Sequence, residues 1–182
     1  ACIDYTNDNI IYLGTGDPNY YYPRFGIWKS TDGGQNWAQS TTGMGNRLPV
    51  EILMDPTNPN VLVTATDNGI YKSTNAGANW SLVKTGGDFT DMQFKPGSTN
   101  TLYACTYSEF WRSTDFGSTW TQITNGVVIP GGGSGNGMRM AVSAANPNVV
   151  YLGMITDEGT ILKSTNGGTR FTTVYHNPSQ SL

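Results

Sequence analysis

Four copies of one eight-residue motif constrain this chain more than any other feature of its sequence. The copies read STDGGQNW, STNAGANW, STDFGSTW and STNGGTRF, and they start at Ser30, Ser73, Ser113 and Ser164. The starts lie 43, 40 and 51 residues apart, a spacing typical of a repeated supersecondary unit. Each motif follows a short apolar segment (GIWK, GIYK, EFWR or TILK), and a second shared segment lies further upstream (NIIYLGTG, NVLVTATD, NTLYACTY or NVVYLGMI). Because these elements recur in register, the sequence predicts a row of similar folding units.

Each repeat reads as four short strands, called A to D here, that are joined by turns. In the second repeat we expect strand A at 50–54, strand B at 61–66, strand C at 70–73 and strand D from residue 80. Pro-Thr-Asn-Pro-Asn separates A from B, and Asp-Asn-Gly predicts a tight hairpin between B and C. Strand B is apolar on both faces, which suits a sheet packed between two others. The repeat therefore predicts an all-β fold, a β-propeller of four-stranded antiparallel blades.

The alignment of the repeats suggests four blades that belong to a larger propeller. We expect the blades at 1–45, 46–86, 87–125 and 138–178. Ile3 aligns with Met54, Phe94 and Val142 at the end of strand A, so the first strand would start before residue 1. An open row of four blades would expose faces that are built to be buried. We therefore expect the remaining blades of a parent propeller, or a second chain, to complete the fold.

Composition and charge argue against several classes of function. The net charge is −3, and the ten lysines and arginines are scattered, so neither nucleic acid nor an anionic membrane is an expected partner. No apolar run reaches the length of a membrane span, so membrane insertion is not expected. Cys2 and Cys105 form no metal motif, and the single histidine, His176, has no ligand-like neighbour. We expect no metal and no cofactor, and we expect Cys105 to be a buried thiol.

The repeated pattern S-T-[D/N]-x-G-x-x-[W/F] resembles the Asp-box family, also called the bacterial neuraminidase repeat. The resemblance covers nearly the whole chain, and the family includes sialidases, xyloglucanase-type glycoside hydrolases, sortilin-type receptors and many secreted bacterial propellers. It implies a secreted or cell-surface protein of bacterial origin. In this family the Asp-box lies on the outer rim, away from the ligand site. The third motif residue can cap backbone N–H groups of the turn, and the aromatic eighth residue can cover the hairpin. Both positions are therefore expected to be structural, and they comprise Asp32, Trp37, Asn75, Trp80, Asp115, Trp120, Asn166 and Phe171.

The candidate ligand residues lie on the opposite face, where the B–C loops and D–A connections of a propeller emerge. The long B–C loop of the first blade carries Tyr20, Tyr21, Tyr22 and Arg24, a composition suited to stacking and hydrogen bonding with a ligand. These tyrosines could equally pack over the blades as a lid.

A second set of candidates lines the predicted axial channel. Glu51, Asp91 and Arg139 occupy one equivalent position near the start of strand A, and Arg47 belongs to the same rim. They could form a ligand site or solvated channel walls.

Three functions fit these observations. The first is a non-catalytic recognition propeller that binds a polysaccharide or a protein. The second is a glycoside hydrolase of the xyloglucanase type acting on a β-glucan, with Asp17, Glu51 and Asp91 as candidate carboxylates. In that family an acid stands in a Thr-Asp-x-Gly-Gly run, whereas this chain has Gly14-Thr15-Gly16-Asp17. The third is a spacer module of a large surface protein. A sialidase fits poorly, because the Arg-Ile-Pro signature is absent and only Arg139 has an axial position.

Overall fold

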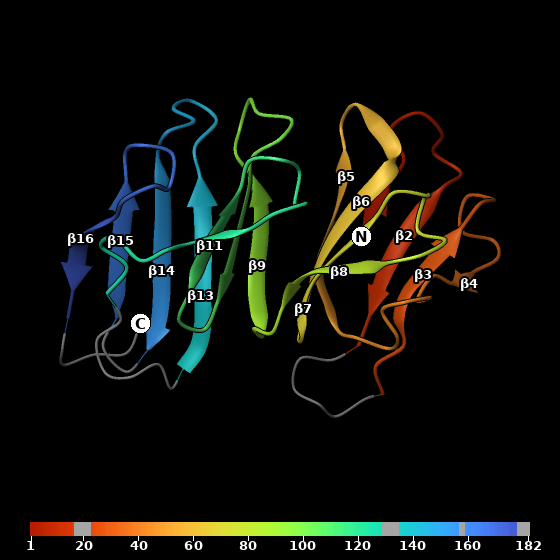
Figure 1. Ribbon diagram of the computed structural model, residues 1–182, viewed down its shortest axis with the longest axis horizontal. Helices are drawn as coiled ribbons and strands as arrows, with labels where there is room; N and C mark the ends of the chain where they lie inside the picture. The colour runs from red at the N-terminus through yellow and green to blue at the C-terminus, as the bar shows by residue number, and fades with distance from the viewer. Residues whose placement is uncertain (17–22, 129–134, 157–158, 178–182) are drawn as a thin grey trace. The chain divides into compact units, whose positions relative to one another are not determined.

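The computed structural model describes residues 1–16, 23–128, 135–156 and 159–177, which form four sheets of four strands each (Figure 1). In every sheet the strands pair antiparallel in chain order, so each sheet is a meander. This confirms the predicted all-β fold of four-stranded antiparallel blades. No helix in the described ranges is long and apolar enough to cross a membrane.

The four blades take their strands from consecutive parts of the chain. The first contains β1 (Cys2–Ile3), β2 (Ile11–Thr15), β3 (Gly26–Ser30) and β4 (Ala38–Gln39). The second contains β5 (Pro49–Asp55), β6 (Asn58–Thr66), β7 (Gly69–Ser73) and β8 (Ser81–Thr85). The third contains β9 (Phe89–Phe94), β10 (Leu102–Thr106), β11 (Phe110–Ser113) and β12 (Thr121–Ile123). The fourth contains β13 (Gly135–Val142), β14 (Val150–Thr156), β15 (Thr160–Ser164) and β16 (Thr172–His176).

The chain divides into two compact units. Unit 1 comprises residues 1–88 together with 116–118, and unit 2 comprises residues 89–115 together with 119–182. Unit 1 therefore holds the first two blades, and unit 2 holds most of the third blade and the whole fourth.

Strand pairing reproduces the alignment of the repeats residue by residue. The four residues at the predicted end of strand A each face the same position of strand B, in the pairs Ile3–Ile11, Met54–Leu62, Phe94–Leu102 and Val142–Val150. The positions that the repeat alignment predicted to be equivalent are therefore equivalent in the strand pairing.

One turn is shorter than the sequence suggested. The prediction placed Pro-Thr-Asn-Pro-Asn between strands A and B of the second blade, but β6 already begins at Asn58, which pairs with Asp55. Asp55 Oδ1 accepts hydrogen bonds from the Thr57 backbone N–H at 2.8 Å and from the Thr57 hydroxyl at 2.7 Å. This side-chain cap closes the turn over two residues and leaves the following residues free to pair.

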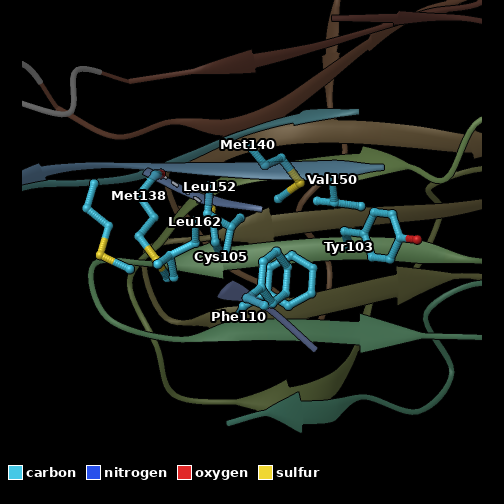
Figure 2. Close-up of a cluster of buried hydrophobic side chains, with 10 residues drawn as sticks. Tyr103, Cys105, Phe110, Met138, Met140, Val150, Leu152 and Leu162 are labelled. Atoms are coloured by element: carbon cyan, nitrogen blue, oxygen red, sulfur yellow. Dashed lines mark hydrogen bonds between the residues drawn. The ribbon is translucent and has the colours of Figure 1, made fainter. Parts of the chain in front are cut away.

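Each unit has an apolar core between its blades. In unit 1, Tyr12 and Ile27 of the first blade pack with Ile52, Met54 and Leu62 of the second. In unit 2, Tyr103, Cys105 and Phe110 lie among side chains of the fourth blade such as Met138 and Leu152 (Figure 2). Phe110 meets Phe171 edge to face, with ring centroids 5.0 Å apart. Burial of each large apolar side chain stabilises such a core by about 1.5–3 kcal/mol.

Candidate functional site

In the Asp-box turns, polar side chains accept hydrogen bonds from backbone N–H groups of the same turn. In the first box, Ser30 Oγ accepts the Gly34 N–H at 2.8 Å, and Asp32 Oδ1 accepts the Asn36 N–H at 2.9 Å. The hydrogen bonds from Asn36, backbone first, lower the pKa of Asp32 to about 2. The other boxes repeat the cap from the third motif residue, with distances of 2.9 Å at Asn75, 2.9 Å at Asp115 and 3.1 Å at Asn166. These carboxylates and amides hold turns together, a role that asparagine fills as well as aspartate.

The aromatic residues that close the boxes differ in burial. The exposed fraction is 3% for Trp80 and 1% for Phe171, but 36% for Trp37. Trp80 Nε1 donates to Ser40 O of the first blade at 2.9 Å, whereas Trp37 Nε1 donates to Gly34 O of its own box. The repeat pattern predicts that all four aromatic residues cover their hairpins equally. Trp37 departs from this because, in the described part of the chain, the first blade has no preceding blade to pack against.

On the opposite side of unit 1, the predicted candidate Arg24 lies in a cluster of charges. Its guanidinium forms an ion pair with Asp67, whose side chain is 5% exposed. Asp67 Oδ1 also accepts the Leu48 N–H at 3.0 Å. Burial raises the pKa of Asp88, and the nearby charge of Arg24 opposes that rise. We call Arg24, Asp67 and Asp88 the loop-face cluster. The first two residues come from the B–C loops of the first and second blades, and Asp88 comes from the segment that follows the second blade.

The remaining candidates divide between the units. Glu51, Asp91 and Arg139 do occupy one equivalent position, since they pair with Ala65, Cys105 and Gly153. In unit 1, Glu51 is half-buried and its Oε1 accepts the Ile52 N–H at 3.3 Å, and Arg47 is half-buried on the same rim.

Unit 2 brings Asp91 and Arg139 onto adjoining strands. Asp91 Oδ2 accepts the Met140 N–H at 2.9 Å, and the exposed Arg139 donates to Thr90 O. Asp91 therefore holds the backbone of β13. Asp17 and Tyr20 to Tyr22 lie outside the described residues.

Two features of unit 1 were missed by the sequence analysis. Asp67 was interpreted only as a turn former, because its ion pair with Arg24 joins residues 43 apart in the chain. The second feature is a groove of about 370 Å³ on the Asp-box side, between the first and second blades. Its lining includes Lys29, Trp37, Gln39 and Ala76. The signal for it in the sequence is Trp37, one of its lining residues, which the repeat pattern assigns to hairpin packing.

Burial raises the pKa of both described thiols, Cys2 and Cys105, and no metal cluster occurs in the described ranges. Cys105 is fully buried, and burial raises its pKa to about 12, so it stays protonated near neutral pH. Its Sγ donates to Met138 O at 3.3 Å. No group of three or more potential metal ligands occurs in the ranges that the structure describes.

A family model decides the relationship of this chain. The model Sortilin-Vps10, described as sortilin and neurotensin receptor 3, matches residues 26–129, which is more than half of the chain. The chain belongs to the Sortilin-Vps10 family. The matched range includes the first three Asp-box motifs of this Sortilin-Vps10 chain and the members of the loop-face cluster other than Arg24. No curated protein sequence matches the chain.

Solved structures show the same fold in larger proteins. An ancestral GH74 enzyme is similar at a TM-score of 0.75 and 22% identity, over 96% of this chain and 23% of that protein. The GH74 xyloglucanase from Xanthomonas campestris gives a TM-score of 0.69 and 18% identity, over 95% of this chain and 29% of the enzyme. An auxiliary nutrient binding protein from Bacteroides thetaiotaomicron gives 0.61 and 14% identity, over 99% of this chain and 42% of the protein. The Sortilin-Vps10 chain thus spans less than half of each of these proteins, and the likeness shows the β-propeller fold.

Proposed function

We propose that this chain belongs to a secreted or cell-surface propeller that recognises a polysaccharide or protein ligand without cleaving it. The ligand would lie on the face of the B–C loops and D–A connections, over the loop-face cluster and the tyrosine-rich loop. The half-exposed Arg24, which the buried Asp67 carboxylate holds in place, carries the proposal. A guanidinium held by a carboxylate is suited to hydrogen bonding with a sugar or a peptide.

The hydrogen bonds that the Asp67 and Asp91 carboxylates accept favour ligand binding over cleavage. Asp67 and Asp91 accept backbone N–H groups of Leu48 and Met140, so both have structural partners. A glycosidase needs one carboxyl group that delivers a proton and a second that acts as base or nucleophile. Each of these two aspartates therefore positions a strand or a loop with one of its carboxylate oxygens.

Hydrolysis of a β-glucan is the alternative, and one observation favours it. Burial raises the pKa of Asp88, which is the direction required of a general acid. Asp88 lies in the same cluster as Arg24 and is partly accessible. The similarity in fold to GH74 enzymes supports testing this activity.

Binding and cleavage can be measured on the same samples. Xyloglucan and mixed-linkage β-glucan would be tested by affinity electrophoresis and by release of reducing ends. We expect retardation without release, and we expect Tyr21→Ala to weaken retardation at least tenfold. Tyr5→Ala is the matched control, because Tyr5 is 52% exposed in the A–B turn at the other end of the first blade.

The outcomes separate the two functions. Release of reducing ends that disappears in Asp88→Asn would make the chain a hydrolase and overturn the proposal. Absence of retardation, with the variant and wild-type proteins folded by circular dichroism, would exclude these polysaccharides. A protein ligand would then be sought by the same pair of tyrosine variants.

A further inference from the structure

The groove on the Asp-box side of unit 1, called the rim groove here, has a counterpart one repeat later in the chain. The rim groove lies between the first and second blades and is lined by Lys29 of β3 and by residues 76–78 of the second box. The corresponding lysine of the second blade, Lys72 of β7, contacts residues 116–118 of the third box, which belong to the same unit. The two places share a main-chain arrangement and differ in side chains.

The main chain is alike at both places. Lys29 Nζ donates to Ala76 O at 2.9 Å, and Lys72 Nζ donates to Phe116 O at 2.8 Å. Ala76 and Phe116 are the fourth residues of their boxes, with φ values of 54° and 50°. The Tyr12 hydroxyl also donates to Ala76 O at 2.9 Å, so two strands of the first blade fix this carbonyl. The two box residues therefore present their side chains to the lysine in the same way.

The side chains that cover the second lysine are missing at the first. The Phe116 side chain is 3% exposed, and its ring centre lies 5.4 Å from Lys72 Nζ. Lys72 also donates to Ser118 Oγ at 2.7 Å. At these two positions the second box has only the methyl groups of Ala76 and Ala78. The rim groove, with a volume of about 370 Å³, therefore opens where an aromatic ring and a hydroxyl lie one repeat later.

Lys29 has hydrogen-bonding capacity left for an occupant of the groove. Within the described ranges its ammonium donates one hydrogen bond, to Ala76 O. Burial lowers the pKa of Lys29, against the effect of the Asp4 charge, because desolvation disfavours the charged form. An aromatic ring and a hydrogen-bond acceptor placed beside the ammonium would offset that desolvation, as Phe116 and Ser118 do at Lys72.

Both walls of the rim groove come from blades that follow each other in the chain. Each blade of a propeller packs only on its two neighbours, so the contrast between Ala76 and Phe116 does not depend on further blades. The lining also includes the exposed side chains of Thr31 and Gln39, which can form hydrogen bonds with a peptide main chain.

We propose that the rim groove binds an aromatic residue of a peptide segment of a partner protein. The ring would lie over Lys29, in the place that Phe116 takes over Lys72, and a carbonyl of the peptide would accept a hydrogen bond from the Lys29 ammonium. A sugar supplies acceptors but no π face, so an aromatic residue is the better match to this template. The site lies on the Asp-box side of unit 1 and shares no residue with the loop-face cluster.

A titration followed by NMR spectroscopy tests the proposal on the 182-residue chain. The probe is N-acetylphenylalaninamide, which has one aromatic ring and two carbonyl groups. The backbone amide signals of Lys29 and Ala78 should shift and saturate with a Kd of about 1 mM, as expected for a ligand of about 15 non-hydrogen atoms. N-acetylleucinamide is the non-aromatic control and should bind about fivefold more weakly. Cellobiose tests the groove for a sugar.

Two reciprocal variants use the chain's own template. Ala76→Phe should fill the groove and weaken binding of the probe at least tenfold, and Phe116 shows that phenylalanine tolerates this backbone conformation. Ala145→Phe is the matched control, because Ala145 is exposed in the A–B turn of the fourth blade. Phe116→Ala should open a second groove over Lys72, so that the Lys72 amide signal shifts with the probe as well.

Several results would overturn the proposal. They are the absence of shifts at up to about 20 mM probe, a range that includes weak fragment binding, and shifts that persist unchanged in Ala76→Phe. Equal binding of the leucine probe would show that the groove does not select an aromatic ring. Shifts of the same amides with cellobiose but not with the phenylalanine probe would make it a sugar site instead. Circular dichroism of each variant would show that it is folded.

Discussion

At the residue scale, most of the polar side chains in the repeats serve the backbone that carries them. The box serines and the third box residues accept N–H groups of their own turns, and Asp55 and Asp91 do the same for a turn and a neighbouring strand. These roles could be predicted where the partner is local, as in the boxes. The pair between Arg24 and Asp67 could not, because it depends on how two loops from different blades meet.

The carboxylate of Asp32 should make stability depend on pH in a narrow acidic window. Its pKa in the folded state is about 2, below its ordinary value of 3.8, so the ionised form stabilises the fold. That contribution is fully present above about pH 4 and is lost as the pH falls toward 2. Asp32→Asn should keep the cap and reduce the pH dependence of the free energy of unfolding between pH 4 and 2.

Urea unfolding at a series of pH values measures this dependence. The reverse change at the second box, Asn75→Asp, should increase it, because Asn75 makes the same cap with a neutral side chain. Equal pH dependence in the wild type and both variants would show that the cap does not favour the ionised carboxylate.

At the scale of elements, the sequence predicted the four-stranded blades and the equivalent positions in them, but not how the blades are covered. Equivalent places are taken by Ile3, Met54, Phe94 and Val142, because the recurring segments and the box spacing define them locally. The exposure of Trp37 and the groove beside it depend on which blade packs on which face. A repeat alignment treats all copies as equivalent and therefore does not distinguish a covered copy from an uncovered one.

The glycines after strand D should control the fit between blades. A Cβ on Gly43 would lie 2.2 Å from Trp80 O, and the residue has a φ of 85°. Gly43→Ala should therefore combine an unfavourable left-handed backbone with a clash against the second blade, and should lower the free energy of unfolding by about 2–4 kcal/mol.

Gly45→Ala is the control for the backbone effect alone. Gly45 has a φ of 71°, but no atom lies within 4 Å of the position that a Cβ would take there, so we expect a loss of about 1 kcal/mol. Chemical denaturation of both variants gives the difference. Equal losses would mean that the contact between Gly43 and Trp80 does not limit the packing of the blades.

At the scale of the whole molecule, the chain has two compact units. The proteins that share its fold are larger, and the chain spans 23% of one GH74 enzyme and 29% of another.

Inside each unit, a tyrosine of one blade donates to a main-chain oxygen of the next blade's box: Tyr12 to Ala76 O, and Tyr103 to Gly167 O. The use of a main-chain acceptor has an evolutionary consequence. The fourth box position is occupied by glycine, alanine or phenylalanine, because the neighbouring blade forms its hydrogen bond with the carbonyl and not with the side chain. This hydrogen bond can be kept when a gene duplication copies a box and the side chains of the copy then diverge. Lineages carrying it can gain, lose or exchange blades without evolving a matching partner surface each time.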